Sequence, residues 1–312
     1  MSCKQEPKNT KVKGQVFGTR YSVIYDSDIN FERQFDSLFY VVNKSMSTYQ
    51  TNSDISRLNR NEAHSIDSHF AKVFDASKEI FNSTDGAFDP TIGVLVNAWD
   101  FGPEEKIENL DSLKIDSLML FVGLNKVERL GYIIKKQNPN IFIDFNAIAK
   151  GYGVDVIAEF LEAKNTHNYL VEIGGEIRAK GLNIEKGSDW KVGLEKPNFD
   201  GTQSVLKAIT IKNEAMATSG TYRKFKVDDN GNRYAHIIDT KTGYPSKTNL
   251  LSISVIAKDC MTADAFATAF KAMGIEKSKI FLKSHPELKM FLIFENDKKE
   301  LETLSLNGFP ED

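Results

Sequence analysis

Residues 141–155 read Ile-Phe-Ile-Asp-Phe-Asn-Ala-Ile-Ala-Lys-Gly-Tyr-Gly-Val-Asp, and the organisation of the chain is clearest from this stretch. Its first five residues form a short apolar run, which is typical of a strand. From about residue 150 to 164 apolar residues recur at helical spacing, among them Val154 and Ile157, so a helix should follow. The stretch therefore predicts a strand that leads into a helix.

Upstream of this stretch, the apolar pattern predicts one strand and two helices. Alternation over residues 15–25 is typical of a strand with one buried face. Apolar residues at steps of three and four predict helices at 31–46 and 68–82. Between these helices, the polar and turn-rich residues 48–61 should form a surface loop that faces a cleft.

Downstream, the chain reads mainly as strands, and most neighbours should pair antiparallel. Asn230-Gly231 is a hairpin turn signal between two of them. A last helix is expected at 262–273, with Thr262 as its N-cap and Gly274 just past its end. The predicted strands are 168–173, 190–195, 206–212, 222–227, 233–239, 250–257 and 289–294.

The order of these elements lacks a regular alternation of strand and helix. It therefore predicts an α+β fold, with mostly antiparallel sheets and helices packed on them. The chain of 312 residues is long enough for one large domain or two moderate ones. We expect residues 1–14 to form a flexible tether, because the polar stretch after Cys3 cannot pack, and residues 15–312 to form a single domain.

The charge and hydropathy of the chain exclude several classes of function. Its 40 basic and 43 acidic residues leave a formal charge of −3, which provides no general attraction for nucleic acid or an anionic membrane. We therefore expect no nucleic-acid partner, and any phosphate recognition must be local. No apolar run approaches the roughly 18 residues that a bilayer-spanning helix needs, so a membrane link is expected only through a lipid anchor.

The chain has only two cysteines, Cys3 and Cys260, so a disulfide framework is excluded. Cys3 stands near the start and precedes a polar stretch, as in a mature bacterial lipoprotein whose signal peptide has been removed. In that case Cys3 carries the lipid, whereas the alternative is an accidental cysteine in a frayed terminus. Cys260, beside an Ala-rich helix, is more often a small buried residue.

Asp264 and Thr268 lie four residues apart in the predicted helix 262–273, and hence on the same face. A carboxylate and a hydroxyl in this arrangement can bind one magnesium ion, which takes a carbonyl, waters or substrate phosphates as its other ligands. The alternative is an aspartate near a helix N-terminus, favoured by the helix dipole, with Thr268 in the core. The spacing alone leaves both interpretations open.

Lys150 lies where the predicted strand gives way to the helix, a place where free backbone N–H groups gather. Such a segment suits an anion, and Gly151 and Gly153 allow the backbone to approach a ligand closely. The spacing matches neither a Walker A loop nor a dinucleotide-binding fingerprint. A plain turn between a strand and a helix is the alternative.

His236 lies near the end of the predicted strand 233–239, before a Gly-Tyr-Pro turn at 243–245. A histidine is partly neutral at neutral pH and can act as a general base on a hydroxyl. The alternative is a histidine bonded to a neighbouring carbonyl. Tyr49 is a candidate to lie against a flat ring, and residues 86–102 are candidates to bound a pocket for an adenine or isoalloxazine.

The order of several short blocks along residues 15–295 resembles the FAD:protein FMN transferase (ApbE) family. The blocks are Phe17-Gly18-Thr19, Met46-Ser47-Thr48-Tyr49 with Ser53 to Asn59, Gly86-Ala87-Phe88-Asp89-Pro90-Thr91 leading to Trp99, Asp144 to Asp155, Gly174-Gly175-Glu176, Ala217-Thr218-Ser219-Gly220, His236 to Asp239 with Thr242-Gly243, and Ala263 to Thr268. So many blocks in the same order are rare by chance.

The resemblance implies a fold and a set of site residues. The fold would be ApbE-like and related to the T-fold, with an FAD cleft between sub-domains. The implied magnesium ligands are Asp264, Thr268 and the backbone carbonyl of Ala147. Residues implied to line the FAD site are Phe17, Tyr49, Ala87, Phe88, Asp89, Asp144, Lys150 and Ile237. The family usually has Met at Phe17, where a Phe keeps an apolar contact, and often a small residue at Asn146.

The activity that the resemblance implies is magnesium-dependent transfer of FMN from FAD to a Thr or Ser hydroxyl of an acceptor protein, with release of AMP. His236 would take the hydroxyl proton, and Lys150 would share the charge that builds on AMP. The implied acceptor is a subunit of a membrane redox complex, on the periplasmic side of the bacterial inner membrane. Alternatives are a magnesium-dependent FAD pyrophosphatase, a non-enzymatic flavin-binding lipoprotein, and a structural lipoprotein without a ligand.

Overall fold

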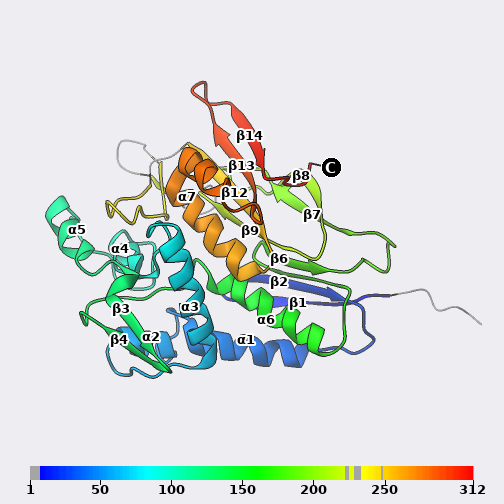
Figure 1. The fold of residues 1–312 in the computed structure, drawn as a ribbon, viewed down its shortest axis with the longest axis horizontal. Coiled ribbons are helices and arrows are strands. Elements are labelled where there is room, and N and C mark those ends of the chain that lie inside the picture. The colour runs from blue at the N-terminus through cyan, green and yellow to red at the C-terminus, as the bar shows by residue number, and fades with distance from the viewer. Residues whose placement is uncertain (1–7, 222–224, 228–232, 247–248, 312) are drawn as a thin grey trace, which may run out of the picture.

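A computed structural model describes residues 8–221, 225–227, 233–246 and 249–311, and its centre is an eight-stranded sheet (Figure 1). All pairings within this sheet are antiparallel, as predicted. Its strands, in spatial order, are β1 (Thr10–Val16), β2 (Thr19–Tyr25), β5 (Tyr169–Ile173), β6 (Glu176–Lys180), β9 (Ala215–Gly220), β12 (Leu250–Ala257), β13 (Lys289–Glu295) and β14 (Leu301–Leu306).

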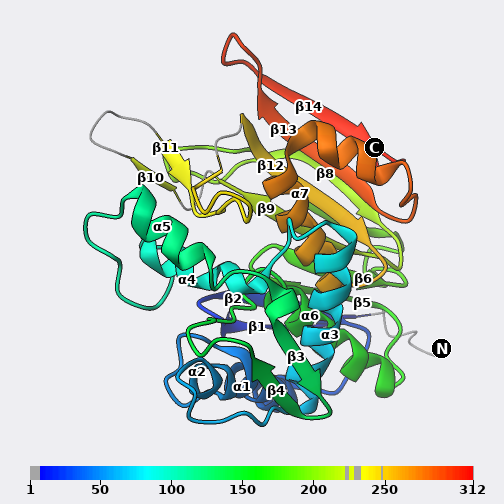
Figure 2. The same cartoon turned by 60° about the vertical axis from the view of Figure 1, so that its left-hand side comes forward.

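The helices fall into two groups. Helices α6 (Ala149–Ala163) and α7 (Cys260–Leu282) pack on the sheet. The others form a helical region, defined here as residues 32–136. It contains α1 (Glu32–Met46), α2 (Asp54–Asn59), α3 (Ser68–Ser83), η1 (Pro90–Ile92), α4 (Gly93–Ala98), α5 (Ser112–Met119), η2 (Leu124–Lys126) and the hairpin of β3 (Val127–Leu130) and β4 (Ile133–Lys136). Figure 2 shows α3 of the second group beside α6 and α7 of the first. Among the described residues, no helix is both long and apolar enough to span a bilayer.

The sheet carries a layer on each face. Helices α6 and α7 lie side by side on one face, between the sheet and helices α1 and α3 (Figure 1). The hairpin of β7 (Trp190–Glu195) and β8 (Val205–Ile211) covers the other face. In β12, Val255 joins the core cluster that contains α7 residues, whereas Ile256 packs with Trp190. All residues of β12 are buried, as expected for a strand covered on both sides.

Helix α6 approaches its neighbours closely because its first turns contain glycines. A Cβ atom added at Gly151 would lie 2.3 Å from the carbonyl oxygen of Cys260, closer than any real contact of this kind. A Cβ atom at Gly153 would lie 2.5 Å from the ring of Phe17. These two glycines therefore allow α6 to touch both α7 and the β1–β2 turn.

Helix α7 begins at Cys260, before the predicted start. Its N-cap is Asp259 rather than Thr262, because the Asp259 carboxylate accepts a hydrogen bond from the backbone N–H of Thr262 at 2.8 Å. Thr262 is thus the third residue of the helix, whose N–H needs an acceptor from outside the helix. At Gly274 a φ of 76° interrupts the helix, and a further helical segment continues to Leu282.

The predicted strand 15–25 is a hairpin rather than a single strand. Strands β1 and β2 pair along their full length, and Phe17 and Gly18 form the turn between them. Both turn residues have positive φ, 51° for Phe17 and 72° for Gly18, as in hairpin turns of the I′ type. An aromatic residue rarely adopts this conformation, which is why the pattern did not predict the turn. Because β1 begins at Thr10, the predicted tether of residues 1–14 is too long.

The predicted strand at 141–145 has no strand partner in the described part of the chain. A side chain takes that place. The Asn59 side chain accepts a hydrogen bond from the N–H of Ile143 and donates one to the carbonyl of Ile143, both at 2.8 Å. One amide group thus replaces a neighbouring strand, and the segment still leads into α6 as predicted.

The remaining predictions agree with the structure in most places. Predicted helices 31–46, 68–82 and 150–164 correspond to α1, α3 and α6, and predicted strands 168–173, 190–195, 206–212, 250–257 and 289–294 correspond to β5, β7, β8, β12 and β13. The predicted loop 48–61 contains α2, and the strand predicted at 233–239 ends at Ala235 in β11 (Arg233–Ala235), which pairs with β10 (Phe225–Val227). The turn signal Asn230-Gly231 lies outside the described residues.

Candidate active site

A cavity of about 1060 Å³ lies between the sheet and the helical region. Its size suits a cofactor. Its walls come from the β1–β2 turn, the end of α1, the loop before η1, the loop before α6, the β5–β6 turn, β9, the segment after β11, and α7. Every predicted site residue lines it, namely Phe17, Tyr49, Ala87, Phe88, Asp89, Asp144, Ala147, Lys150, His236, Ile237, Asp264 and Thr268. The structure thus brings these residues together, while their individual roles stay predictions.

Aromatic side chains line the cavity near the β1–β2 turn and the end of α1. The ring of Phe17 packs edge-on against Phe39, with ring centroids 5.7 Å apart. More than half of the Tyr49 side chain is exposed. Partial desolvation of its phenol, together with the negative charge of Asp144, raises the pKa of that phenol. Tyr49 therefore stands close to the loop that leads into α6.

Two acidic residues hold neighbouring loops in place. The Asp89 carboxylate accepts hydrogen bonds from the N–H and the hydroxyl of Thr91 at 2.8 and 2.6 Å, and burial raises the pKa of this carboxyl. The Asp144 carboxylate accepts bonds from the backbone N–H and the side-chain amide of Asn146 at 2.7 and 3.0 Å. The N–H of Asp144 donates to the carbonyl of Pro90 at 2.9 Å, so the two loops form one wall.

The predicted metal ligands lie where α6 meets α7. Asp264 and Thr268 stand on successive turns of α7, and Ala147 lies just before α6. Asp264 is buried, and its Oδ2 accepts a hydrogen bond from the N–H of Gly151 at 3.0 Å. This bond ties the carboxylate to the first turn of α6, close in sequence to Ala147.

Lys150, Glu176 and Asp264 form a charged cluster on the cavity wall. Lys150 makes an ion pair with Glu176, and both acids are almost fully buried. Burial by itself would lower the pKa of Lys150, but the Glu176 and Asp264 carboxylates outweigh it and raise that pKa. Burial raises the pKa of both acids, and Lys150 opposes that shift. Two buried acids thus share one ammonium group.

The charged cluster presents one carboxylate oxygen that a ligand can satisfy. Oε2 of Glu176 is buried and has no hydrogen-bond partner among the described residues, which is costly for a carboxylate oxygen unless a ligand satisfies it. The described residues contain no group of three or more His, Cys, Asp and Glu side chains arranged for a metal. An ion here would therefore rely on hydroxyl, carbonyl and substrate oxygens as well, which suits magnesium.

His236 directly follows β11 and lines the cavity. Its ring packs against Phe101, with centroids 6.3 Å apart and the planes at 61°. The backbone beyond it is tied down, because the carbonyl of Ile237 accepts a bond from the N–H of Ser246 at 2.8 Å. The hydroxyl of Thr240 donates to the carbonyl of Gly86 at 2.6 Å. These contacts fix residues 236–240 beside the loop that contains Ala87 to Asp89.

Sequence reasoning missed the residue that pairs with Lys150. The family resemblance includes the block Gly174-Gly175-Glu176 but gives Glu176 no role. The two glycines have φ of 65° and 109° and form the β5–β6 turn, which turns the chain back at the cavity. The only signal was an acidic residue placed directly after such a turn. Other wall residues without a predicted role include Asn43, Gln50, Glu195 and Thr218.

Two solved flavin transferase structures share this architecture. The chain matches the flavin transferase ApbE from Vibrio cholerae with a TM-score of 0.85 and 32% identity, over 96% of this chain and 97% of that chain. It matches the apo form of the Pseudomonas stutzeri flavinyl transferase ApbE with a TM-score of 0.86 and 28% identity, over 98% of this chain and 96% of that chain. The fold is therefore that of the flavin transferases.

Sequence comparison leads to the same class. The model of the ApbE family matches residues 17–292. The FAD:protein FMN transferase of Haemophilus influenzae is 38% identical over an alignment that covers 95% of this chain and 89% of that protein. The FAD:protein FMN transferase of Vibrio cholerae is 35% identical, covering 98% of this chain and 94% of that protein. The chain belongs to the ApbE family.

Proposed function

We propose that this protein is an FAD:protein FMN transferase, an enzyme that moves FMN from FAD onto an acceptor protein. Relatives of that name and the family match support this activity. The structural observation that carries it is the charged cluster of Lys150, Glu176 and Asp264 on the wall of a large cavity. Transfer at a pyrophosphate requires that its negative charge is neutralised and that the attacking hydroxyl is aligned with the phosphorus. The charged cluster places charged groups on the cavity wall that can serve the first requirement.

Asp264, Thr268 and the carbonyl of Ala147 are the residues that we propose to hold a magnesium ion. The unpartnered Oε2 of Glu176 and the two acids that share one ammonium group support a cation at this place. When bound, magnesium neutralises charge on the pyrophosphate and makes its phosphorus more electrophilic. The N–H of Gly151 holds one oxygen of Asp264, so the orientation of the carboxylate is set by the protein itself.

The proposed reaction exchanges one phosphorus–oxygen bond for another. The oxygen of the acceptor hydroxyl forms a bond to the phosphorus of the FMN half, while the bond from that phosphorus to the bridging oxygen breaks and AMP leaves. His236 takes the hydroxyl proton on a ring nitrogen. Lys150, whose raised pKa keeps it protonated, offers positive charge to the departing phosphate.

The proposed acceptor is a Thr or Ser side chain in a subunit of a membrane redox complex. A hydroxyl acceptor agrees with a histidine on the cavity wall as its base. The product is FMN joined to the acceptor by a phosphoester. Mass spectrometry of a threonine-containing acceptor protein after incubation with enzyme, FAD and magnesium should find the added mass of FMN. The matched acceptor with Val at that position should gain nothing, and FMN on both acceptors or on neither would contradict the proposal.

We also propose that Cys3, outside the described residues, carries a lipid that holds the enzyme on the periplasmic side of the bacterial inner membrane. The polar residues that follow Cys3 support a tether from such an anchor. The full-length protein made in a bacterial host should carry acyl chains on Cys3 and fractionate with membranes. The variant Cys3→Ser should be unmodified and soluble. A wild-type protein without acyl chains would refute the anchor.

A further inference from the structure

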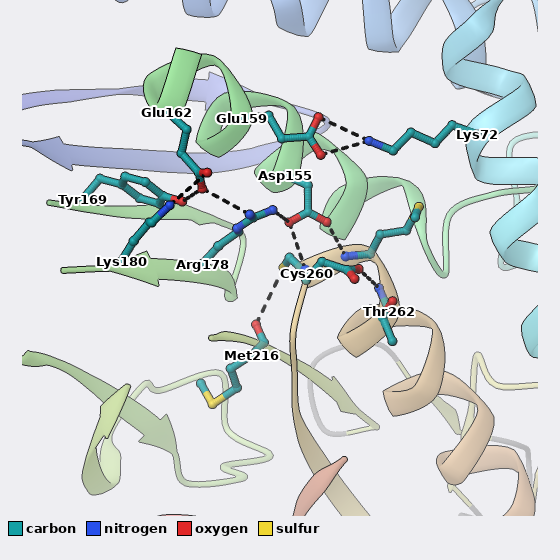
Figure 3. A network of polar contacts seen from close by, with 12 residues as sticks. Lys72, Asp155, Glu159, Glu162, Tyr169, Arg178, Lys180, Met216, Cys260 and Thr262 are labelled. Atoms are coloured by element: carbon teal, nitrogen blue, oxygen red, sulfur yellow. Dashed lines mark hydrogen bonds and ion pairs between the residues drawn. The ribbon is translucent and has the colours of Figure 1, made fainter. Parts of the chain in front are cut away.

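Helix α7 carries two of the proposed magnesium ligands, yet its first turn is held by a residue outside the described wall of the cavity. That residue is Asp155 in α6, whose side chain is 4% exposed. Figure 3 shows Asp155 within a polar network that joins α6, β6 and the start of α7.

The Asp155 carboxylate accepts hydrogen bonds from two backbone N–H groups at the start of α7. Oδ1 accepts from Cys260 at 3.0 Å, and Oδ2 accepts from Met261 at 2.8 Å. Oδ1 also pairs with Arg178 of β6 at 2.8 Å. The carboxylate therefore joins the two helices, and Arg178 fixes its orientation from the sheet.

The N–H groups that Asp155 satisfies are ones that α7 cannot satisfy within the helix. The first four N–H groups of a helix lack an intrahelical partner. The N-cap Asp259 accepts the N–H of Thr262. Asp155 accepts the N–H groups of Cys260 and Met261, from 105 and 106 positions earlier in the sequence. Its negative charge also complements the positive end of the helix dipole. Burial raises the pKa of Asp155 to about 6, so the carboxyl is largely ionised at neutral pH.

A second bond between the same helices runs in the opposite direction. The N–H of Gly151, in the first turn of α6, donates to Oδ2 of Asp264, one turn further along α7 than Cys260. Contacts at two separate points restrict both sliding and rotation of α7 on α6. The side chains of Asp264 and Thr268 project from the helix that is held in this way.

We infer that Asp155 is a positioning residue, which fixes Asp264 and Thr268 in the cavity by holding the first turn of α7 against α6. This inference rests on the magnesium site proposed above. Asp155 is placed to act through α7 and not on substrate, because its carboxylate faces backbone N–H groups and Arg178. Its loss should therefore weaken metal and FAD binding more than the stability loss alone would explain.

Two substitutions and one control separate positioning from simple stability. Asp155→Ala removes both acceptors, and Asp155→Asn keeps one acceptor oxygen. Glu162→Gln is the matched control, because Glu162 belongs to the same network through Arg178 at 3.2 Å and Tyr169 at 2.5 Å, and its described contacts do not include α7. All measurements are made well below the unfolding temperature of each variant, so that every sample is folded.

The readouts are the magnesium concentration for half-maximal transfer, the Kd for FAD from fluorescence titration, and hydrogen exchange of residues 260–268. Asp155→Ala should raise the magnesium requirement about 10–100-fold, the usual effect of losing a residue that orients a metal ligand. It should also weaken FAD binding and speed exchange in 260–268. Asp155→Asn should lie between Asp155→Ala and wild type, and Glu162→Gln should match wild type.

Wild-type magnesium and FAD affinities in Asp155→Ala, with only a lower unfolding temperature, would show that Asp155 is merely structural and would overturn the inference. If transfer by the wild-type enzyme needs no magnesium, the magnesium proposal fails instead. In that case weaker FAD binding together with faster exchange in 260–268 of Asp155→Ala still supports positioning, and unchanged FAD binding refutes it.

Discussion

The Asp264 carboxylate accepts a hydrogen bond from the backbone N–H of Gly151 at 3.0 Å, across 113 positions of sequence. The bond is possible because α6 touches α7 at a residue without a side chain. A Cβ atom at Gly151 would lie 2.3 Å from the carbonyl oxygen of Cys260 and 2.8 Å from the Cβ of Asp264. The contact at Gly151 therefore both packs α6 against α7 and orients the Asp264 carboxylate, a proposed metal ligand.

Gly151→Ala should damage the enzyme severely, because the methyl group meets backbone that cannot move without separating α6 from α7. Overpacking of this kind typically costs about 1–3 kcal/mol in unfolding free energy. We also expect kcat/KM for FAD to fall at least about 10-fold, since the loss of one oriented ligand has effects of that size. Urea unfolding and steady-state kinetics measure the two effects.

Gly153→Ala is the matched comparison for that substitution. Its methyl group would meet the ring of Phe17 at 2.5 Å, and that ring is a side chain with some freedom to move. We expect a smaller loss of stability and an unchanged magnesium requirement. A larger stability loss for Gly153→Ala than for Gly151→Ala would show that the α6–α7 contact is less strict than the structure indicates.

Thr268→Val should raise the magnesium concentration needed for half-maximal transfer, because Val matches Thr in shape but lacks the oxygen ligand. Thr268→Ser keeps the hydroxyl and should stay close to wild type. Transfer rates across a magnesium titration test both variants. Equal behaviour of Val and Ser at this position would remove Thr268 from the proposed ligands.

His236→Ala should lower kcat for transfer by about 10²–10⁴, the usual contribution of a general base, while FAD still binds. Retained FAD binding by fluorescence shows that the cavity is intact. Full transfer activity in this variant would exclude His236 as the base.

Release of AMP in the absence of an acceptor separates transfer from hydrolysis. A transferase should release AMP in step with FMN on the acceptor, and only slowly with FAD and magnesium alone. Chromatographic assay of AMP over many enzyme equivalents measures this. Rapid, multiple-turnover release of AMP and free FMN without an acceptor would identify an FAD pyrophosphatase instead.

Lys271→Met should stabilise the protein at neutral pH. Lys271 of α7 is fully buried, its Nζ has no hydrogen-bond partner in the described part of the chain, and burial lowers its pKa from 10.5 to about 7. The unfolded chain binds this proton more tightly, so stability falls as the pH drops from about 10.5 to about 7 and is level below that. Met has a similar size and no charge to desolvate, and should add on the order of 2–4 kcal/mol at pH 7.

Urea unfolding at pH 7 and pH 9 tests this prediction. The wild type should gain stability between these values, and Lys271→Met should lack that gain. The exposed Lys277 on the same helix provides the control, because Lys277→Met removes a solvated charge. The same pH dependence in wild type and Lys271→Met would show that Lys271 is charged in the native state.

Strong periodicity made the long elements predictable from sequence. In α1, Phe35, Phe39 and Val42 recur on one face and are all buried. The predicted strand at 141–145 failed because its partner is the amide of Asn59, and no local pattern shows that a distant side chain will replace a strand. The β1–β2 turn was hidden because Phe17 occupies a backbone conformation that its residue type rarely adopts.

The site was predictable mainly through its family resemblance. The helical spacing of Asp264 and Thr268 suggests a shared face, but spacing alone also fits a capped helix with a core threonine. The pairing of Lys150 with Glu176 joins the start of α6 to the β5–β6 turn. Such a pair depends on how the helix lies across the sheet, which local sequence does not encode. The hold of Asp155 on α7 is of the same kind.

The amide of Asn59 makes two hydrogen bonds to Ile143 where a full ladder would otherwise run. The loop that follows contains Asp144 and Ala147. It is therefore attached to the helical region through Asn59, and it leads into α6, which packs on the sheet. The walls of the cavity need residues of both the sheet and the helical region. Flavin binding should accordingly arise late in folding, once the helical region has packed against the sheet.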